Sequence, residues 1–216
     1  MKQQSKIKYI LQELGAHLPY SIFGITMGIT VMGILTFFAI LMGREAMMPV
    51  ASKELFHISH AGHILFSSLT TTAMFWKHEK RLFKAILVGL IGSVSICGVS
   101  DILIPFFGGK LIGAEMAVHV CLLQEPDLVL SFAFIGVLVG LLVPAAVEKS
   151  TEYSHSVHVL FSSAASILYL LAFGLQGWID SLSAVFFVTI VAVVLPCCAS
   201  DIVFPLACTH RNCSHS

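Results

Sequence analysis

Long apolar segments constrain this chain more than any other feature of its sequence. A helix needs about 20 mainly apolar residues to cross the hydrocarbon core of a bilayer. Six segments are close to this length, and they cover residues 20–43, 54–76, 82–107, 128–147, 153–173 and 182–207. Only 11% of the 216 residues are charged and 57% are hydrophobic, so a soluble fold would have too little core for its apolar surface. The sequence predicts an all-α integral membrane protein with six transmembrane helices.

The first apolar segment is predicted to be a retained span rather than a cleaved signal peptide. Lys2, Lys6 and Lys8 precede it, as basic residues do in a signal peptide. However, the segment 20–43 is longer than the roughly 7–15 apolar residues of such a peptide. No small-residue cleavage motif follows it.

The basic residues predict an orientation in the cell's inner or plasma membrane. In the six-span arrangement, nine of the twelve Lys and Arg fall on the side of the two termini and the 77–84 loop. Only Arg44, Lys53 and Lys110 fall on the other side. Because cytoplasmic loops carry the excess of Lys and Arg, both termini are expected in the cytoplasm. The formal net charge is zero, which gives no indication of a nucleic-acid partner.

Two parts of the chain nearly copy each other. Residues 59–68 (SHAGHILFSS) resemble 154–163 (SHSVHVLFSS), and residues 97–105 (CGVSDILIP) resemble 197–205 (CCASDIVFP). Each copy holds three predicted spans, so the second copy enters the membrane in the opposite direction, as in inverted-repeat transporters. The predicted parts are a first repeat (1–109), an outer connector (110–127), a second repeat (128–207) and a cytoplasmic tail (208–216).

The repeated polar positions are predicted to bind a metal ion. Histidines three residues apart share one face of a helix, and a charged Asp within a span costs roughly 2.5–3.5 kcal/mol unless it is paired. Imidazole and carboxylate ligands together suit Zn²⁺ and its first-row neighbours. The predicted ligands are His60, His63 and Asp101 in the first copy and His155, His158 and Asp201 in the second.

Other donors accompany these positions. The additional candidates in the repeats are His57, Glu152, Cys97 and Cys197, and those in the tail are Cys208, His210, Cys213 and His215. Pro105 and Pro205 each stand four residues beyond an Asp and leave its backbone carbonyl without a helical donor. His119 and Cys121 do not share a helical face, and no role is predicted for them.

The predicted topology places the first ligand set in the outer half of the membrane and the second in the inner half. The two sets would lie on the order of 12 Å apart in a hydrocarbon core about 30 Å thick. Helix tilt would instead merge them into one central site. The structural alternative is that these polar side chains only bond helix to helix.

Three functions are compatible with this pattern. The first is a permease or secondary transporter for a divalent transition metal of the Zn, Mn, Fe, Ni and Co class, with protons on histidine as a coupling ion. The second is an intramembrane zinc-dependent hydrolase, and the third is a haem-binding electron carrier. The expected partners are the lipid bilayer and the metal ion, and a six-span chain is also compatible with a homodimer.

Overall fold

The protein is a bundle of helices. The computed structural model describes residues 6–142, 151–175 and 177–209, and every regular element in these ranges is helical. The α-helices are α1 (Lys6–Leu41), α2 (Met48–His78), α3 (Leu82–Gly98), α4 (Ile104–Leu111), α5 (Cys121–Gln124), α6 (Pro126–Leu142), α8 (Thr151–Phe173), α9 (Leu182–Cys198) and α10 (Phe204–Cys208). The prediction of an all-α fold is confirmed for the described residues.

Three helical segments are long and apolar enough to cross a membrane. They are Leu18–Leu41 in α1, Leu82–Leu111 from α3 through α4, and His155–Phe173 in α8. Pro126–Leu142 and Leu182–Cys197 are apolar but shorter. The remaining long helix, α2, contains many Ser, Thr and His residues, and most of these are buried within the bundle.

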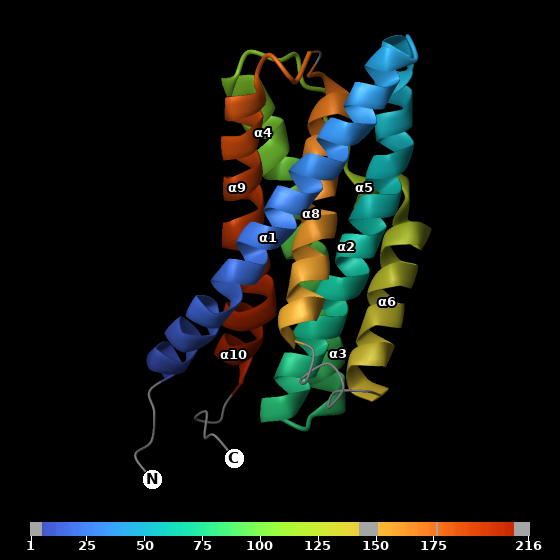
Figure 1. Ribbon diagram of the computed structural model, residues 1–216. Helices are drawn as coiled ribbons and strands as arrows, with labels where there is room; N and C mark the ends of the chain where they lie inside the picture. The colour runs from blue at the N-terminus through green and yellow to red at the C-terminus, as the bar shows by residue number, and fades with distance from the viewer. Residues whose placement is uncertain (1–5, 143–150, 176, 210–216) are drawn as a thin grey trace.

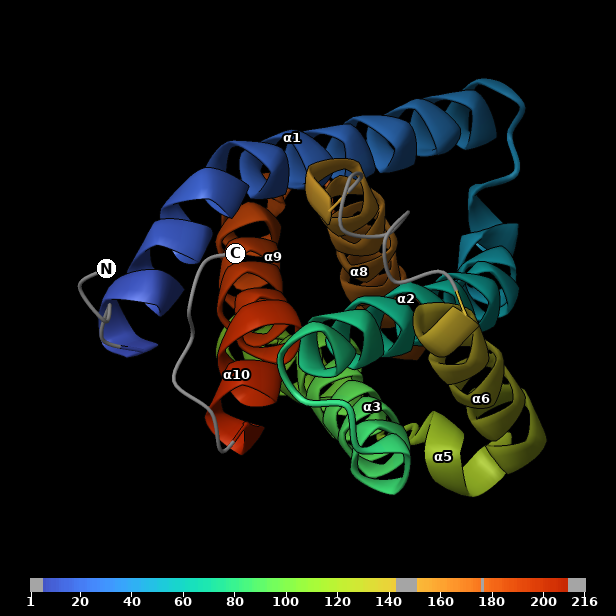
Figure 2. The ribbon, with the colours of Figure 1, turned by 90° about the horizontal axis from the view of Figure 1, so that it is seen from below.

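Helices α2 and α8 form the centre of the bundle and run in opposite directions (Figure 1). Helix α1 crosses the bundle diagonally and packs on α8, whereas α6 packs on α2 (Figures 1 and 2). The start of α1, the α2–α3 turn and the end of α10 lie at one end of the bundle (Figure 1). We call this the terminal end, and the end that holds the α1–α2 turn the opposite end.

Glycines allow the outer helices to approach the central pair closely. A Cβ atom on Gly24 or Gly28 of α1 would overlap Val159 or Ser163 of α8. On the other side of the bundle, a Cβ atom on Gly136 or Gly140 of α6 would overlap the backbone of α2. Both contacts therefore use a pair of small residues four apart, which is a common way to bring two membrane helices together.

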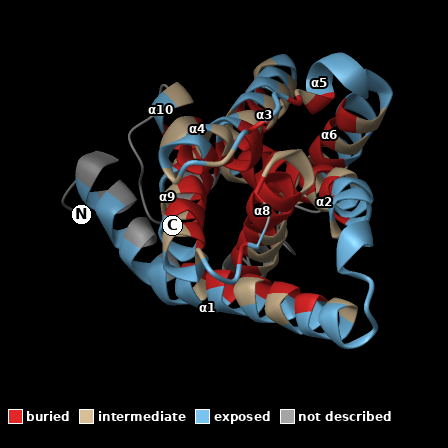
Figure 3. Ribbon diagram, turned by 90° about the horizontal axis from the view of Figure 1, so that it is seen from above, coloured by how far each residue is buried: buried red, intermediate tan, exposed pale blue. Residues whose placement is uncertain are grey.

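Many apolar side chains are exposed, and many polar side chains are buried beside the apolar core. Large apolar side chains such as Phe83, Phe107 and Phe187 are exposed on the outside of the bundle. Much of α2 and α8 is buried (Figure 3), and the buried residues of these helices include many serines, threonines and histidines. This distribution suits a lipid solvent, because lipid favours apolar groups outside and leaves polar groups to bond with one another.

A π-helical turn follows α3 and another follows α9. The turns are η2 (Val99–Leu103), between α3 and α4, and η3 (Ala199–Val203), between α9 and α10. Each turn is followed after one residue by a proline, Pro105 or Pro205. Because a π-turn bonds residue i to i+5 and proline cannot donate to i−4, the wider turn accommodates the proline. Turns of this kind are frequent at functional sites.

The connector between α4 and α6, residues 112–125, enters the bundle. It contains the short helix α5, and α6 begins well below the upper ends of α2 and α8 (Figure 1). His119 and Cys121 in this connector are buried.

Candidate metal centre

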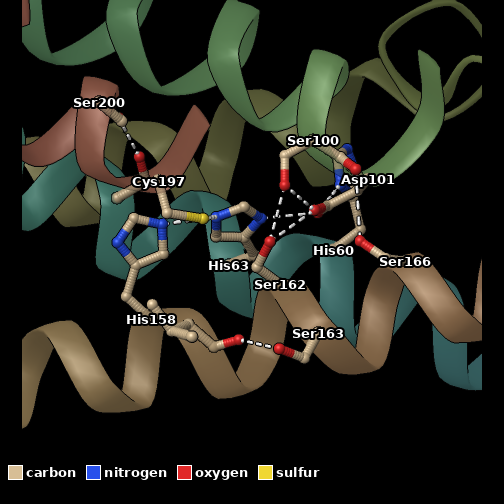
Figure 4. A network of polar contacts seen from close by, with 12 residues as sticks. His60, His63, Ser100, Asp101, His158, Ser162, Ser163, Ser166, Cys197 and Ser200 are labelled. Carbon is tan, nitrogen blue, oxygen red and sulfur yellow. Dashed lines mark hydrogen bonds and ion pairs between the residues drawn. The ribbon is translucent and has the colours of Figure 1, made fainter. Parts of the chain in front are cut away.

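The central donor group consists of His63 on α2, His158 on α8 and Cys197 on α9. Their ligand atoms all lie within 4.8 Å of one another, and all three residues are buried. The Nε2 atoms of His63 and His158 are 2.5 Å apart, and the Cys197 Sγ lies 3.6 Å from the His63 Nε2. Figure 4 shows the three side chains converging from three separate helices.

These distances are close to those of a tetrahedral metal site. With zinc–nitrogen bonds of about 2.0–2.1 Å and a zinc–sulfur bond of about 2.3 Å, a nitrogen and a sulfur ligand lie about 3.6 Å apart and two nitrogens about 3.3 Å. The nitrogen–sulfur distance already fits. The two imidazoles would separate by less than about 1 Å to admit an ion.

Asp101 orients the histidines of α2. Its Oδ2 atom accepts hydrogen bonds from the Nδ1 atoms of His60 (2.8 Å) and His63 (2.7 Å). A carboxylate can only accept, so the Nδ1 atom of His63 carries a proton. When the ring is neutral, its Nε2 atom therefore holds the lone pair that faces His158 and Cys197. This is the carboxylate–histidine arrangement that fixes the tautomer of metal ligands.

Two serines complete the environment of the carboxylate. The hydroxyl groups of Ser100 and Ser162 lie 2.9 and 3.1 Å from the Oδ1 of Asp101, and 2.7 Å from each other. Both oxygens of Asp101 therefore have donors although the residue is fully buried. Hydrogen bonds to both carboxylate oxygens offset the cost of burying the charge.

Hydroxyl groups also join the segments of the two sequence copies. Ser67 on α2 bonds to the Ser200 hydroxyl at 2.8 Å, and Thr71 donates to the Ser200 carbonyl at 3.0 Å. The counterparts show the same contacts: the Ser162 and Ser100 hydroxyls lie 2.7 Å apart, and Ser166 donates to the Ser100 carbonyl at 3.3 Å.

A second donor group lies nearer the opposite end of the bundle. It consists of His57 on α2, His119 in the connector and Cys121 at the start of α5, again with all ligand atoms within 4.8 Å of one another. The Nε2 atoms of His57 and His119 are 3.0 Å apart. His119 and Cys121 are buried, and His57 is half-buried. Two histidines and one cysteine thus recur in both donor groups.

Burial sets the protonation of the connector residues. Burial lowers the pKa of His119, with a smaller contribution from His57, so that its ring is neutral near pH 7 and can act as a ligand. Burial raises the pKa of the Cys121 thiol to about 12, and the charges of Asp101 and Glu125 add to the effect. A cation bound at this thiol has to displace its proton.

The predicted site residues are distributed over different contacts. His63 and Asp101 of the first predicted set lie together with His60, but His63 also meets His158 of the second set. One residue from each predicted set therefore contributes to the central group. His155 instead bonds through Nε2 to the Ser21 hydroxyl on α1 at 2.9 Å.

The additional candidates behave differently from one another. Cys197 belongs to the central group and His57 to the second group. Cys97 is buried but belongs to neither group. Cys208 is half-buried, and its carbonyl accepts a bond from Lys84 at 2.6 Å. The side chains of Glu152 and Asp201, and the residues His210, Cys213 and His215, lie outside the described part of the chain.

Sequence reasoning missed His119 and Cys121 because it tested them only for a shared helical face. In an extended segment, residues two apart point to the same side, and the connector before α5 is not helical. The two-residue spacing of His119 and Cys121 in a non-helical connector was therefore the sequence feature that could have identified them as donors on one side of the chain.

Both donor groups combine nitrogen and thiol ligands that suit a transition-metal ion. No protein-family profile, curated protein or solved structure matches this chain.

Proposed function

We propose that the chain is a membrane permease that moves a divalent transition-metal cation through the centre of the bundle. The observation that carries this proposal is the buried group of His63, His158 and Cys197, drawn from three helices of both sequence copies. Three protein ligands leave the fourth position of a tetrahedral ion open, and an open position allows ligand exchange. A transported ion needs such exchange, because it must be released as well as bound.

The charge of the centre supports a divalent cation. Imidazole is a neutral ligand, a metal-bound cysteine is a thiolate, and Asp101 contributes a carboxylate that reaches the centre through His63. The two negative charges balance the two positive charges of the ion. Without such a balance, a charge in this fully buried place would cost several kcal/mol.

The contacts between the sequence copies support six spans arranged as two inverted repeats. His63 and His158 are equivalent positions, 95 residues apart in sequence, and they contact each other. Phe66 and Phe161, also 95 apart, stack with their ring centres 5.6 Å apart. Equivalent residues that touch are expected only on a two-fold axis. The hydroxyl contacts are related in the same way: Ser200 contacts Ser67 and Thr71, and its equivalent Ser100 contacts the equivalent residues Ser162 and Ser166.

The distribution of surface residues supports a membrane location. The exposed apolar side chains cover the helices between the two ends of the bundle. Lys77, Lys80, Arg81 and Lys84 follow one another at the α2–α3 turn, which lies at the terminal end (Figure 1). The positive-inside rule then favours a cytoplasmic terminal end.

Rocking of one repeat against the other would open the centre to one side at a time. The centre takes His63 from the first repeat and His158 and Cys197 from the second, so a relative movement separates the ligands. Hydroxyl groups of both repeats meet beside it, and hydrogen bonds of this kind are individually worth only about 0.5–1.5 kcal/mol. Exchange of these bonds would accompany the movement, and the cation would be released when the ligands part.

The geometry is less favourable for the two other functions considered. The Nε2 atoms of His63 and His158 are 2.5 Å apart, and this distance leaves no room for a haem macrocycle between the two rings. A hydrolase would use the same three ligands around a metal-bound water. Ion flux distinguishes the permease from the hydrolase, because a hydrolase carries none.

The test is cation flux into proteoliposomes that contain a metal-sensitive dye. We compare the unmodified protein with His158→Gln and Cys197→Ser, after checking each by size-exclusion chromatography and circular dichroism. His78→Gln is the matched histidine control, because His78 is the last residue of α2 and belongs to neither donor group.

The proposal predicts saturable flux of zinc or cobalt that falls at least tenfold in both central variants and stays unchanged in the control. Equal flux in the central variants and the unmodified protein would contradict it. Flux no greater than that of protein-free liposomes would contradict it as well.

A further inference from the structure

The second donor group is assembled by two segments that are far apart in the sequence. His57 comes from the first third of α2, whereas His119 and Cys121 come from the connector. The 3.0 Å between the two Nε2 atoms is close to the roughly 3.3 Å between two nitrogen ligands of a tetrahedral ion. The group needs little rearrangement to hold a cation.

Contacts with α8 hold the connector in place. The backbone N–H of His119 donates to the Tyr169 hydroxyl at 3.1 Å, and this hydroxyl donates to the Ala117 carbonyl at 3.3 Å. The N–H of Ala117 donates to the Phe173 carbonyl at 2.7 Å. The ring of His119 stacks on Phe173 with ring centres 4.6 Å apart. The donors are therefore positioned by the protein itself, which lowers the entropic cost of binding an ion.

The second group is more accessible than the central one. His57 is half-buried, whereas all three central donors are buried. The exposed carboxylates of Glu54 and Glu125 act electrostatically on His57 and attract cations, against a smaller opposing effect of Lys53. A cation arriving from solution would meet this group before the centre.

Helix α2 connects the two groups. His57, His60 and His63 stand at intervals of three residues on one helix, so the outermost and the central donor are separated by about 9 Å along its axis. His60 lies between them and shares the Asp101 carboxylate with His63. The Phe56 ring stacks on His60 and contacts His119, so an aromatic side chain lies between the two donor groups.

We propose that His57, His119 and Cys121 form a second transition-metal site, which loads the central site from the opposite end of the bundle. The donor set suits Zn²⁺, Co²⁺ and similar borderline cations. Binding at this site is independent of transport. Its loading role rests on the proposed permease function.

Cobalt binding tests the site directly, because cobalt–thiolate bonds absorb light and report cysteine ligation. We would titrate the purified full-length protein with Co²⁺ in a background with Cys208→Ser and Cys213→Ser, which removes the tail thiols. Cys121→Ser removes the second site's thiol, and Cys197→Ser removes the central one. His119→Gln provides an independent variant of the second site, with His78→Gln as its control.

The expected result is two thiolate-bound cobalt ions per chain in the background protein. Cys121→Ser and Cys197→Ser should each retain one, and their combination none. His119→Gln should weaken the second site at least tenfold, whereas His78→Gln should leave it unchanged. Retention of the full absorption band in folded Cys121→Ser would overturn the second site. A full band in Cys197→Ser would instead count against the centre, and so against the proposed function.

Flux kinetics test the loading role. Cys121→Ser should raise the cobalt concentration at half-maximal flux about tenfold and leave the maximal rate within about twofold of the background protein, because the central ligands are intact. An unchanged half-saturating concentration would overturn the loading role while leaving the binding result to stand by itself.

Discussion

Replacing Asp101 with asparagine should weaken metal binding at the centre without removing the site. Asp101 is not among the three central donors. It acts through His63, whose Nδ1–H it accepts at 2.7 Å. Asparagine has nearly the same shape and can still present one oxygen to this proton. The substitution therefore removes the negative charge while preserving most of the packing.

The magnitude follows from the bonds to Oδ2. Hydrogen bonds to a charged group are worth about 1.5–3 kcal/mol, against about 0.5–1.5 kcal/mol for neutral ones. Only the bond to His63 leads to a ligand, so about 1–1.5 kcal/mol is lost there. Loss of charge balance around the ion adds to this, and outer-shell partners of metal ligands typically contribute 10- to 100-fold in affinity. We expect a loss of about 1.4–2.7 kcal/mol, since each tenfold change equals about 1.4 kcal/mol.

The assay is competition between the protein and a chelating dye for zinc. A Cys121→Ser background leaves the central site to dominate the signal. Asp101→Asn should raise the dissociation constant 10- to 100-fold with an unchanged number of sites, and Asp101→Glu should recover part of the affinity. Asp127→Asn is the control, because Asp127 is an exposed carboxylate at the start of α6.

Two results would refute this reasoning. A dissociation constant within threefold of the background protein would show that the carboxylate does not tune the centre. Complete loss of binding in a folded Asp101→Asn protein would show that Asp101 is itself a ligand, contrary to its position beside the Nδ1 atoms.

Two further predictions concern helix packing and the role of His60. Gly28→Leu should lower the free energy of unfolding by about 1–3 kcal/mol, because its side chain would overlap Ser163. Gly33→Leu is the control and should change the free energy little, because a Cβ atom there meets no neighbour within 4 Å. Thermal melting in detergent measures both variants, and equal melting temperatures would contradict close α1–α8 packing. His60→Gln should preserve zinc affinity within about threefold, because His60 contacts Asp101 yet belongs to neither donor group; competition with a chelating dye measures this, and a loss of more than tenfold in the folded variant would show that His60 is itself a ligand.

The helices were predictable because their chemistry is local. Apolar runs of span length and polar residues at intervals of three identify helices such as α2 from the sequence alone. Pro105 and Pro205 indicated a backbone irregularity at each Asp, and the structure has π-helical turns there. The change of helical pitch itself was not visible, because it depends on how the turn packs.

The pairing of donors was not predictable from spacing. His60 and His63 share a helical face, but whether His63 meets His155, His158 or neither depends on the crossing of α2 and α8. Close packing of these helices sets that choice. The second group was hidden for a related reason, because His119 approaches His57 only when the connector enters the bundle.

The exchange of contacts between Ser67–Ser200 and Ser162–Ser100 has an energetic consequence. Suppose that each half can adopt the conformation now held by the other half. A bundle that is open to one side of the membrane and a bundle that is open to the other side would then contain matching hydrogen bonds. Their free energies then differ mainly through parts that lack a counterpart, above all the segment carrying His119 and Cys121. If the proposed transport holds, such a protein would respond to the cation concentration on either side of the membrane, and this connector would set which of the two conformations it prefers at rest.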